Sequence, residues 1–270
     1  MKMPSQSLNV AVIQNGAGCD PDANLRGVEQ LLSQVTAVDL IAVPEVFACR
    51  GSDEATREVA EPVPDGRVCR TLAAWAVTRH CWVLAGSVIE RAGARIYNTS
   101  VLFDRQGQVA AVYRKIHLFE AYLDHGQAIR ESDVYAAGAI PVSVDLEGWR
   151  FGLAICYDVR FPELFRLYSA QGAHGFFLPA NFTQRTGQAH WETLVRARAI
   201  ENQAYVLAPD QCGVNPVTDV KSHGHSLVVG PWGEILAQAG DEEAVLHATL
   251  DPATLDYTRR RVPVLSHRRL

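Results

Sequence analysis

An apolar segment that runs into a cysteine is the part of this sequence best suited to covalent chemistry. Residues 149–155 predict a strand, Cys156 follows it directly, and Pro162 opens a predicted helix. A turn from strand to helix holds a nucleophile away from the sheet and directs backbone N–H groups toward it. The segment therefore predicts a nucleophilic thiol at Cys156. A structural cysteine buried at the end of a strand is the alternative interpretation.

A nucleophilic thiol needs a base for its proton and a cation for the oxyanion that it creates. No histidine stands in a papain-like or caspase-like pattern. Instead, Glu45 ends an apolar strand pattern, and Lys115 lies within another, where an unpaired charge is costly to bury. Because the carboxyl ends of parallel strands gather at one edge of a sheet, we expect Glu45 and Cys156 to meet there. Each charge alone is typical of a surface group or a structural ion pair, but together with the thiol they supply what acyl transfer requires.

The elements that must position these groups alternate between short β-branched runs and helical patterns, with several hairpins. This order predicts an α/β fold with two sheets packed face to face and helices outside them, in a single domain over residues 1–270. Residues 120–138 show no periodicity, which is typical of a functional loop. The expected strands are 8–14, 40–44, 81–89, 97–104, 109–118, 140–146, 149–155, 176–179, 205–208, 225–229 and 244–251, and the expected helices are 24–38, 68–79, 162–170, 190–202 and 252–261.

Composition narrows the class of protein. The 25 basic and 30 acidic residues give a net charge of -5, which argues against a nucleic-acid partner. The arginines of residues 259–269 are interpreted as a solvated tail or a subunit contact. No apolar run is long enough to span a membrane, and the start lacks the apolar core of a signal peptide. The six cysteines form no C-x-x-C pair, so we expect a cytoplasmic protein in which the five other than Cys156 are small buried hydrophobic residues.

At the same segments the sequence resembles the nitrilase superfamily of carbon–nitrogen hydrolases. The resemblance rests on Pro44-Glu45, on Tyr-Arg-Lys-Ile-His-Leu at 113–118 and on the cysteine elbow, and it covers nearly the whole chain. It implies a four-layer αββα sandwich that pairs into αββααββα across a homodimer. It also implies a small-molecule amide substrate, with no metal and no cofactor.

Within the superfamily the chain is most similar to the branch of deaminated-glutathione amidases and ω-amidases. Residues 156–164, 186–205 and 224–233 carry this similarity, and 211–213 and 263–269 favour the deaminated-glutathione type. True nitrilases typically have Cys-Trp-Glu where this chain has Cys-Tyr-Asp. The branch has a second glutamate sixteen residues after the lysine, followed by serine, and here these are Glu131 and Ser132.

The resemblance implies that Glu45 is the base, Cys156 the nucleophile and Lys115 an oxyanion donor beside a backbone N–H, expected at Tyr157. The thioester forms with release of ammonia, and water then hydrolyses it. Glu131 would orient the lysine or the substrate amide. Tyr157, Asn181 and Phe182 are expected to contact the substrate.

Two segments depart from the branch, and both resemble walls of its substrate pocket. One is residues 120–126, and the other is Asn181, where a small residue commonly precedes the phenylalanine. The alternatives for the substrate are therefore an ω-amide or an N-carbamoyl amino acid. An alternative of another class is a non-catalytic interaction protein that keeps the fold. Such a protein would be expected to lose Glu45, Lys115 or Cys156, and all three are present.

The remaining histidines are interpreted as structural. His223 and His225 flank a glycine, but no third ligand stands at zinc-like spacing, so we expect no metal site. His117 and His190 are expected to bond backbone groups. Arg198 and Glu201 are expected to form an i,i+3 pair on one helix.

Overall fold

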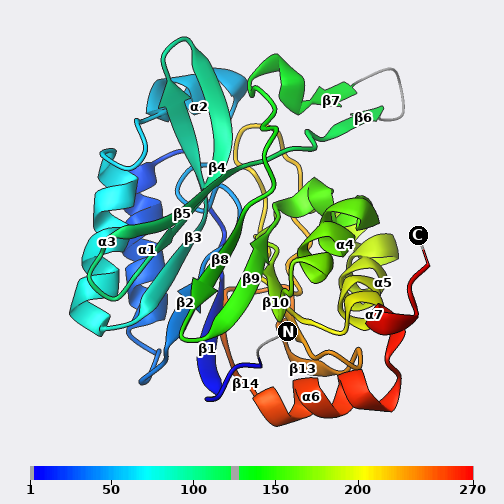
Figure 1. Ribbon diagram of the computed structural model, residues 1–270. Helices are drawn as coiled ribbons and strands as arrows, with labels where there is room; N and C mark the ends of the chain where they lie inside the picture. Colours follow the sequence, from blue (N-terminus) through cyan, green and yellow to red (C-terminus); the bar gives the residue numbers. More distant parts are fainter. Residues whose placement is uncertain (1–2, 123–127, 270) are drawn as a thin grey trace.

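The computed structural model describes residues 3–122 and 128–269. Two six-stranded sheets lie face to face, as the sequence predicts (Figure 1). The first sheet has the order β14-β1-β2-β3-β4-β5. Its strands are β1 (Leu8–Gln14), β2 (Leu40–Ala42), β3 (Trp82–Ala92), β4 (Arg95–Phe103), β5 (Val109–Arg114) and β14 (Ala244–Leu250).

The second sheet has the order β13-β12-β11-β10-β9-β8. Its central strands β9, β10 and β11 run parallel, and the outer pairs are antiparallel. Its strands are β8 (Ser143–Leu146), β9 (Trp149–Leu153), β10 (Gly175–Phe177), β11 (Tyr205–Ala208), β12 (Leu227–Val229) and β13 (Ile235–Gln238).

Helices cover the outer face of each sheet and complete the αββα sandwich (Figure 1). Helices α1 (Pro21–Leu32) and α3 (Arg67–Arg79) lie against the first sheet, and α4 (Pro162–Ala170) and α5 (Gln184–Asn202) lie against the second. The remaining helices are α2 (Asp53–Val59), α6 (Pro252–Arg261) and α7 (Val264–His267).

The two-residue period of the strands builds two separate cores. In β1, Val10 and Val12 belong to the apolar cluster that includes Phe151 of the facing sheet. Ala11 and Ile13 point the other way, into the cluster that holds α1 and α3. Both faces of β1 are buried, which explains its nearly continuous apolar sequence.

Several predicted elements are confirmed with their bounds, among them β1, β11, α4 and α6. Other elements differ from the prediction, and the helix expected at 24–38 spans Pro21–Leu32. The helix expected at 190–202 begins at Gln184, α2 and β13 were not expected, and β5 ends at Arg114, so Lys115 lies just after the strand.

The segment expected to be irregular, 120–138, also contains regular structure. A hairpin of β6 (Glu120–Tyr122) and β7 (Ala128–Arg130) leads into a 3₁₀ turn, η2 (Glu131–Asp133) (Figure 1). Of the atypical stretch 120–126, residues 123–126 lie outside the described residues.

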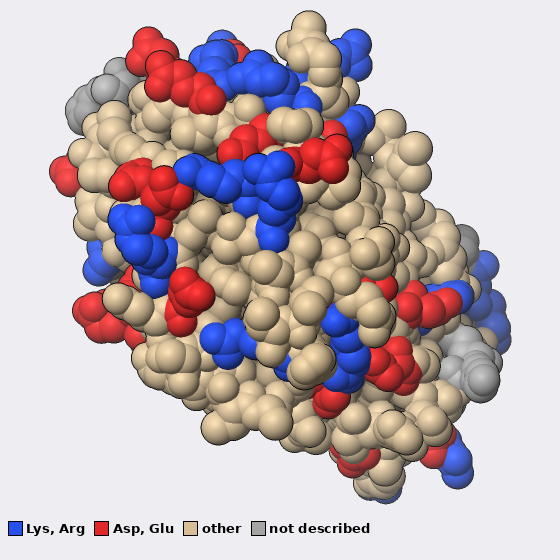
Figure 2. Space-filling model, turned by 90° about the vertical axis from the view of Figure 1, so that its left-hand side faces the viewer, with Lys and Arg blue, Asp and Glu red and all other residues tan. Residues whose placement is uncertain are grey.

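Neither acidic nor basic side chains form a patch of their own on the face that carries α1 and α3. Acidic and basic side chains are interspersed over it (Figure 2). Within the described residues, no helix is long and apolar enough to cross a membrane. Of the five cysteines expected to be buried, four are buried and Cys19 is partly exposed.

Candidate active site

Cys156 opens a 3₁₀ turn, η3 (Cys156–Arg160), three residues after the end of β9. Its φ is 47°, in the left-handed region that a non-glycine residue occupies only at a cost of about 1–3 kcal/mol. The Cys156 N–H donates to the Pro179 carbonyl at 2.8 Å, which holds this conformation. The sequence therefore forms the expected elbow, with the cysteine at its tip.

The Lys115 ammonium lies between two carboxylates. Its Nζ is 2.8 Å from Glu45 Oε1 and 2.8 Å from Glu131. Only 1% of the Lys115 side chain and 3% of the Glu45 side chain are exposed, so water screens this cluster poorly. Burial alone would lower the pKa of Lys115, but the two carboxylates outweigh it and raise that pKa well above its ordinary value. The lysine is a fixed cation.

Glu45 lies three residues after the end of β2, and hydrogen bonds hold both its side chain and its backbone. Asn98 of β4 donates to its Oε1 at 2.8 Å, and the side chain of Gln211 donates to its backbone carbonyl at 2.7 Å. The expectation that Glu45 and Cys156 meet at the edge of one sheet is wrong. Strand β2 belongs to the first sheet and β9 to the second, so the two residues approach each other across the sandwich.

Glu131 reaches Lys115 from the turn η2. Its Oε2 accepts from the Phe119 N–H at 2.7 Å, and its own N–H donates to the Phe119 carbonyl at 2.9 Å. Burial raises the pKa of Glu131, and the nearby Glu45 carboxylate raises it further, while Lys115 opposes both. Burial likewise raises the pKa of the Cys156 thiol well above its usual value, and Glu45 adds to that effect. A thiol whose pKa is raised in this way needs a base when it reacts.

Asp158 connects the lysine segment to the cysteine elbow, a role that was not expected from the sequence. Its carboxylate is fully buried and accepts from Ile155 N–H at 2.8 Å and from Tyr113 Oη at 2.7 Å. It also accepts from the His117 N–H at 3.0 Å and contacts the His117 ring at 2.7 Å. Tyr113 lies two residues before Lys115, and His117 lies two residues after it. The only sequence signal for this role was a charged residue in the turn that directly follows the cysteine.

Replacing Asp158 with asparagine is expected to lower kcat by about 10–100-fold and the free energy of unfolding by about 2–4 kcal/mol, because an amide nitrogen cannot accept the bonds that one carboxylate oxygen accepts. The change in KM should stay within about threefold, since Asp158 does not line the pocket described below. Steady-state kinetics and urea denaturation measure these quantities.

The matched control is Asp145→Asn, which removes an exposed carboxylate paired with Arg150 and should cost at most about 1 kcal/mol. Equal effects of the two variants on kcat would show that Asp158 does not position the site.

A pocket of about 280 Å³ opens beside the cluster. The predicted residues Glu45, Glu131 and Cys156 line it, and so do all three residues expected to contact the substrate. Its walls come from both halves of the chain: Glu45, Val46, Cys49, Arg50, Gly51, Asp53, Thr56, Asn98, Phe119, Ile129, Glu131, Tyr135, Cys156, Tyr157, Arg160, Asn181, Phe182, Thr183, Thr186, Asn215, Thr218, Val220 and Ser222.

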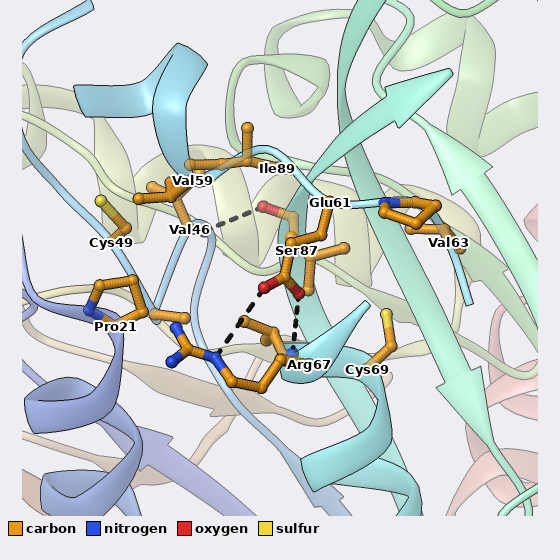
Figure 3. Close-up of a pocket in the computed structure, with 14 residues that line it drawn as sticks. Pro21, Val46, Cys49, Val59, Glu61, Val63, Arg67, Cys69, Ser87 and Ile89 are labelled. Carbon is orange, nitrogen blue, oxygen red and sulfur yellow. Dashed lines mark hydrogen bonds and ion pairs between the residues drawn. The ribbon is translucent and has the colours of Figure 1, made fainter. Parts of the chain in front are cut away.

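A second cavity of about 20 Å³ lies behind Val46 and Cys49, which line both spaces. Figure 3 shows the Glu61 carboxylate directed at the start of α3, where Oε2 accepts from the Val68 N–H at 3.0 Å. The same view shows Ser87 Oγ, which accepts from the Val46 N–H at 2.9 Å and so fixes the backbone next to Glu45. A space of this size holds about one water. The cavity is too small for a substrate, but the residues that line it fix the backbone beside Glu45.

The histidines differ in part from expectation. His117 and His190 were expected to bond backbone groups, but their rings contact side chains, of Asp158 at 2.7 Å and of Arg160 at 3.3 Å. The His223 and His225 rings stack with centroids 4.5 Å apart. Within the described parts of the chain, no group of three or more histidine, cysteine or acidic residues could hold a metal ion.

The expected helix pair is confirmed, with Arg198 Nη1 2.8 Å from Glu201 Oε1.

The fold agrees with the comparisons with known proteins. The family described as carbon-nitrogen hydrolase matches residues 9–260, and the chain belongs to this family. It is 37% identical to a deaminated glutathione amidase from Yersinia enterocolitica, over 98% of this chain and 94% of that protein. It is 33% identical to the omega-amidase NIT3 of Saccharomyces cerevisiae, over 99% of this chain and 95% of that protein.

Solved structures give the same result. The crystal structure of Saccharomyces cerevisiae Nit3, a member of the nitrilase superfamily, superposes with a TM-score of 0.89 at 32% identity and covers 100% of this chain and 99% of that one. The family and its amidase relatives identify this protein as an enzyme that hydrolyses an amide C–N bond.

Proposed function

We propose that Cys156 is the nucleophile of this amidase, with Glu45 as the base, Lys115 as the cation at the oxyanion and Glu131 as the group that orients the lysine. The observation that carries the proposal is the buried ammonium of Lys115, which two carboxylates share. Both carboxylates line the pocket, and so does Cys156, whose backbone is in the left-handed region. A nucleophile, a base and a fixed cation around one pocket are the parts of an acyl-transfer site.

In the first half-reaction Glu45 accepts the Sγ proton while Sγ attacks the amide carbonyl carbon. The oxyanion is stabilised by Lys115 Nζ and by the N–H of Tyr157, the residue that follows the nucleophile in η3. Collapse of the tetrahedral intermediate breaks the C–N bond, and the amine departs with the proton from Glu45. In the second half-reaction Glu45 takes a proton from water, which attacks the thioester and releases the acid and the free thiol.

We propose that the substrate is deaminated glutathione, the compound after which the Yersinia relative is named. Arg160 supports an acid substrate, because its guanidinium lines the pocket and lies over the rings of Tyr157 and Phe182 at 5.7 Å and 5.5 Å. Within the described residues it forms no ion pair with a carboxylate. The expectation of ammonia as the product holds only for a primary amide. Deaminated glutathione would instead release the amine of cysteinylglycine.

The proposed substrate is tested with purified protein and a panel of deaminated glutathione, 2-oxoglutaramate, an N-carbamoyl amino acid and a simple nitrile. The first two yield 2-oxoglutarate, which one coupled assay measures. The highest kcat/KM is expected for deaminated glutathione. A higher value for 2-oxoglutaramate or the carbamoyl compound would reassign the substrate to those alternatives, and a folded protein inactive on every amide would favour the non-catalytic interaction protein.

The two carboxylates are expected to differ in their contribution to rate. Glu45→Gln removes the base and should lower kcat by about 10³-fold or more, whereas Glu131→Gln keeps a hydrogen-bond acceptor for Lys115 and should cost about 10–100-fold. The kcat values of both variants, measured with the same substrate, test this order. A larger loss for Glu131→Gln would show that Glu131 takes part in proton transfer.

We further propose that residues 1–270 form one domain that assembles as a homodimer in the cytoplasm. One apolar cluster joins both sheets, which supports a single domain, and all six cysteines are free thiols, which suits a reducing compartment. Tyr257 and Val262, near the Arg-rich end, are 60% and 43% exposed, which suits a subunit contact. A solution mass of one chain by light scattering would contradict the dimer.

A further inference from the structure

A second arginine lines the substrate pocket. Only 6% of Arg50 is exposed, and its Nε donates to the Ala17 carbonyl at 3.2 Å while Nη1 donates to the hydroxyl of Ser222. These bonds fix the direction of the guanidinium but bring it no negative charge. Nη2 has no hydrogen-bond acceptor among residues 3–122 and 128–269.

The positive charge of Arg50 has no ion-pair partner among the residues that the structure describes. The buried Arg198, in contrast, pairs with Glu201. Asp210 is the carboxyl that acts on it electrostatically, but complete burial raises the pKa of Asp210 well above its usual value and favours the neutral acid. An unpaired buried cation is costly, and an anion that enters the pocket would offset that cost.

The position of Arg50 indicates which end of the substrate it meets. It lies five residues after Glu45 on the same segment, whereas Arg160 lies four residues after Cys156. In the proposed mechanism Glu45 protonates the departing nitrogen, so its segment borders the leaving group. Ser222 links Arg50 to Asn181 with an Oγ-to-Oδ1 distance of 2.5 Å, which keeps the guanidinium close to the wall beside Cys156.

From this geometry we infer that Arg50 binds a carboxylate on the leaving-group side of the scissile amide, so that the preferred substrates are linear amides with an anionic group at each end. The inference rests on the proposed function and deepens it. It assigns selectivity for the leaving amine to one residue of this chain, and it predicts that an amide that releases ammonia is a poorer substrate than one that releases an acidic amine.

The test compares deaminated glutathione with an analogue whose terminal carboxylate is replaced by a methyl group. Both release 2-oxoglutarate, so one assay gives kcat/KM for each. The wild-type enzyme is expected to prefer the carboxylate by about 30-fold or more, the effect of removing one partner from a buried charge pair. In Arg50→Gln that preference should fall below about threefold. Arg196→Gln, which removes a half-exposed arginine paired with Glu192, should retain it.

A wild-type preference below threefold, or a preference that Arg50→Gln retains, would overturn the inference. Thermal melting shows whether Arg50→Gln is folded; if it is not, the wild-type comparison and the charge-retaining Arg50→Lys decide, and the latter should keep part of the preference. Failure of the proposed function gives a different result, since the wild type would then hydrolyse neither compound.

Discussion

Replacement of Cys156 by alanine is expected to lower kcat for amide hydrolysis by about 10⁵-fold or more, the scale on which loss of a catalytic nucleophile acts. Among the described residues that line the pocket, Cys49 carries the other thiol, and its Sγ donates to the Cys19 carbonyl at 3.6 Å. The loss should therefore not be compensated by a second thiol.

The assay is 2-oxoglutarate release, with Cys81→Ala as the control, because Cys81 is fully buried in the core under α3 and does not line the pocket. The control should keep most of the wild-type kcat. Mass spectrometry of the wild type during turnover should show the acyl group on Cys156. More than 1% of wild-type activity in pure Cys156→Ala, on the order of 10³ above expectation, would refute the covalent mechanism.

Replacement of Lys115 by methionine is expected to lower both activity and stability. The rate should fall by about 10²–10³-fold because a fixed oxyanion donor is lost. The free energy of unfolding should fall by about 3–5 kcal/mol, because Glu45 and Glu131 remain buried next to each other without their cation.

The pH dependence separates this electrostatic cost from a simple packing defect. Like charges raise the pKa values of neighbouring carboxyl groups, so one of the two should bind a proton in the variant as the pH falls. The destabilisation is then expected to be larger at pH 8 than at pH 5, measured by urea denaturation at both. Lys221→Met, which removes a partly exposed lysine 3.7 Å from Asp241, is the control and should show little change at either pH. A pH-independent loss in Lys115→Met would contradict the shared-cation arrangement.

The sequence was sufficient to predict the layers and the turn that begins at Cys156. Strands β1 and β11 and helices α4 and α6 have the predicted bounds, because their periodicity and their Pro or Asp caps are local signals. The elbow at Cys156 could be predicted for the same reason: a strand, a polar turn and a helix starting at a proline follow one another within a short stretch of chain. Short elements such as α2 and β13 were missed. Helix α2 has a Ser52 cap, but it buries no residue and therefore shows no apolar periodicity.

The partners of the charged residues could not be predicted from local pattern. Glu45 and Lys115 are 70 residues apart in the chain, and their 2.8 Å contact exists only because β2 and β5 lie in the same sheet. The wrong expectation for Glu45 and Cys156 has the same origin, since the period of a strand does not state which sheet the strand joins.

The sequence by itself determined the types of reactive group, the strand ends that carry them and the elements on either side, because these depend on propensity and period. Three features follow from tertiary contacts alone: Asp158 joins the Lys115 and Cys156 segments, Glu131 and Glu45 share one ammonium, and Arg50 lines the pocket with no ion-pair partner among the described residues. These contacts cross between sheets and loops far apart in the chain, and their strength comes from burial, which exists only once the two sheets have packed together.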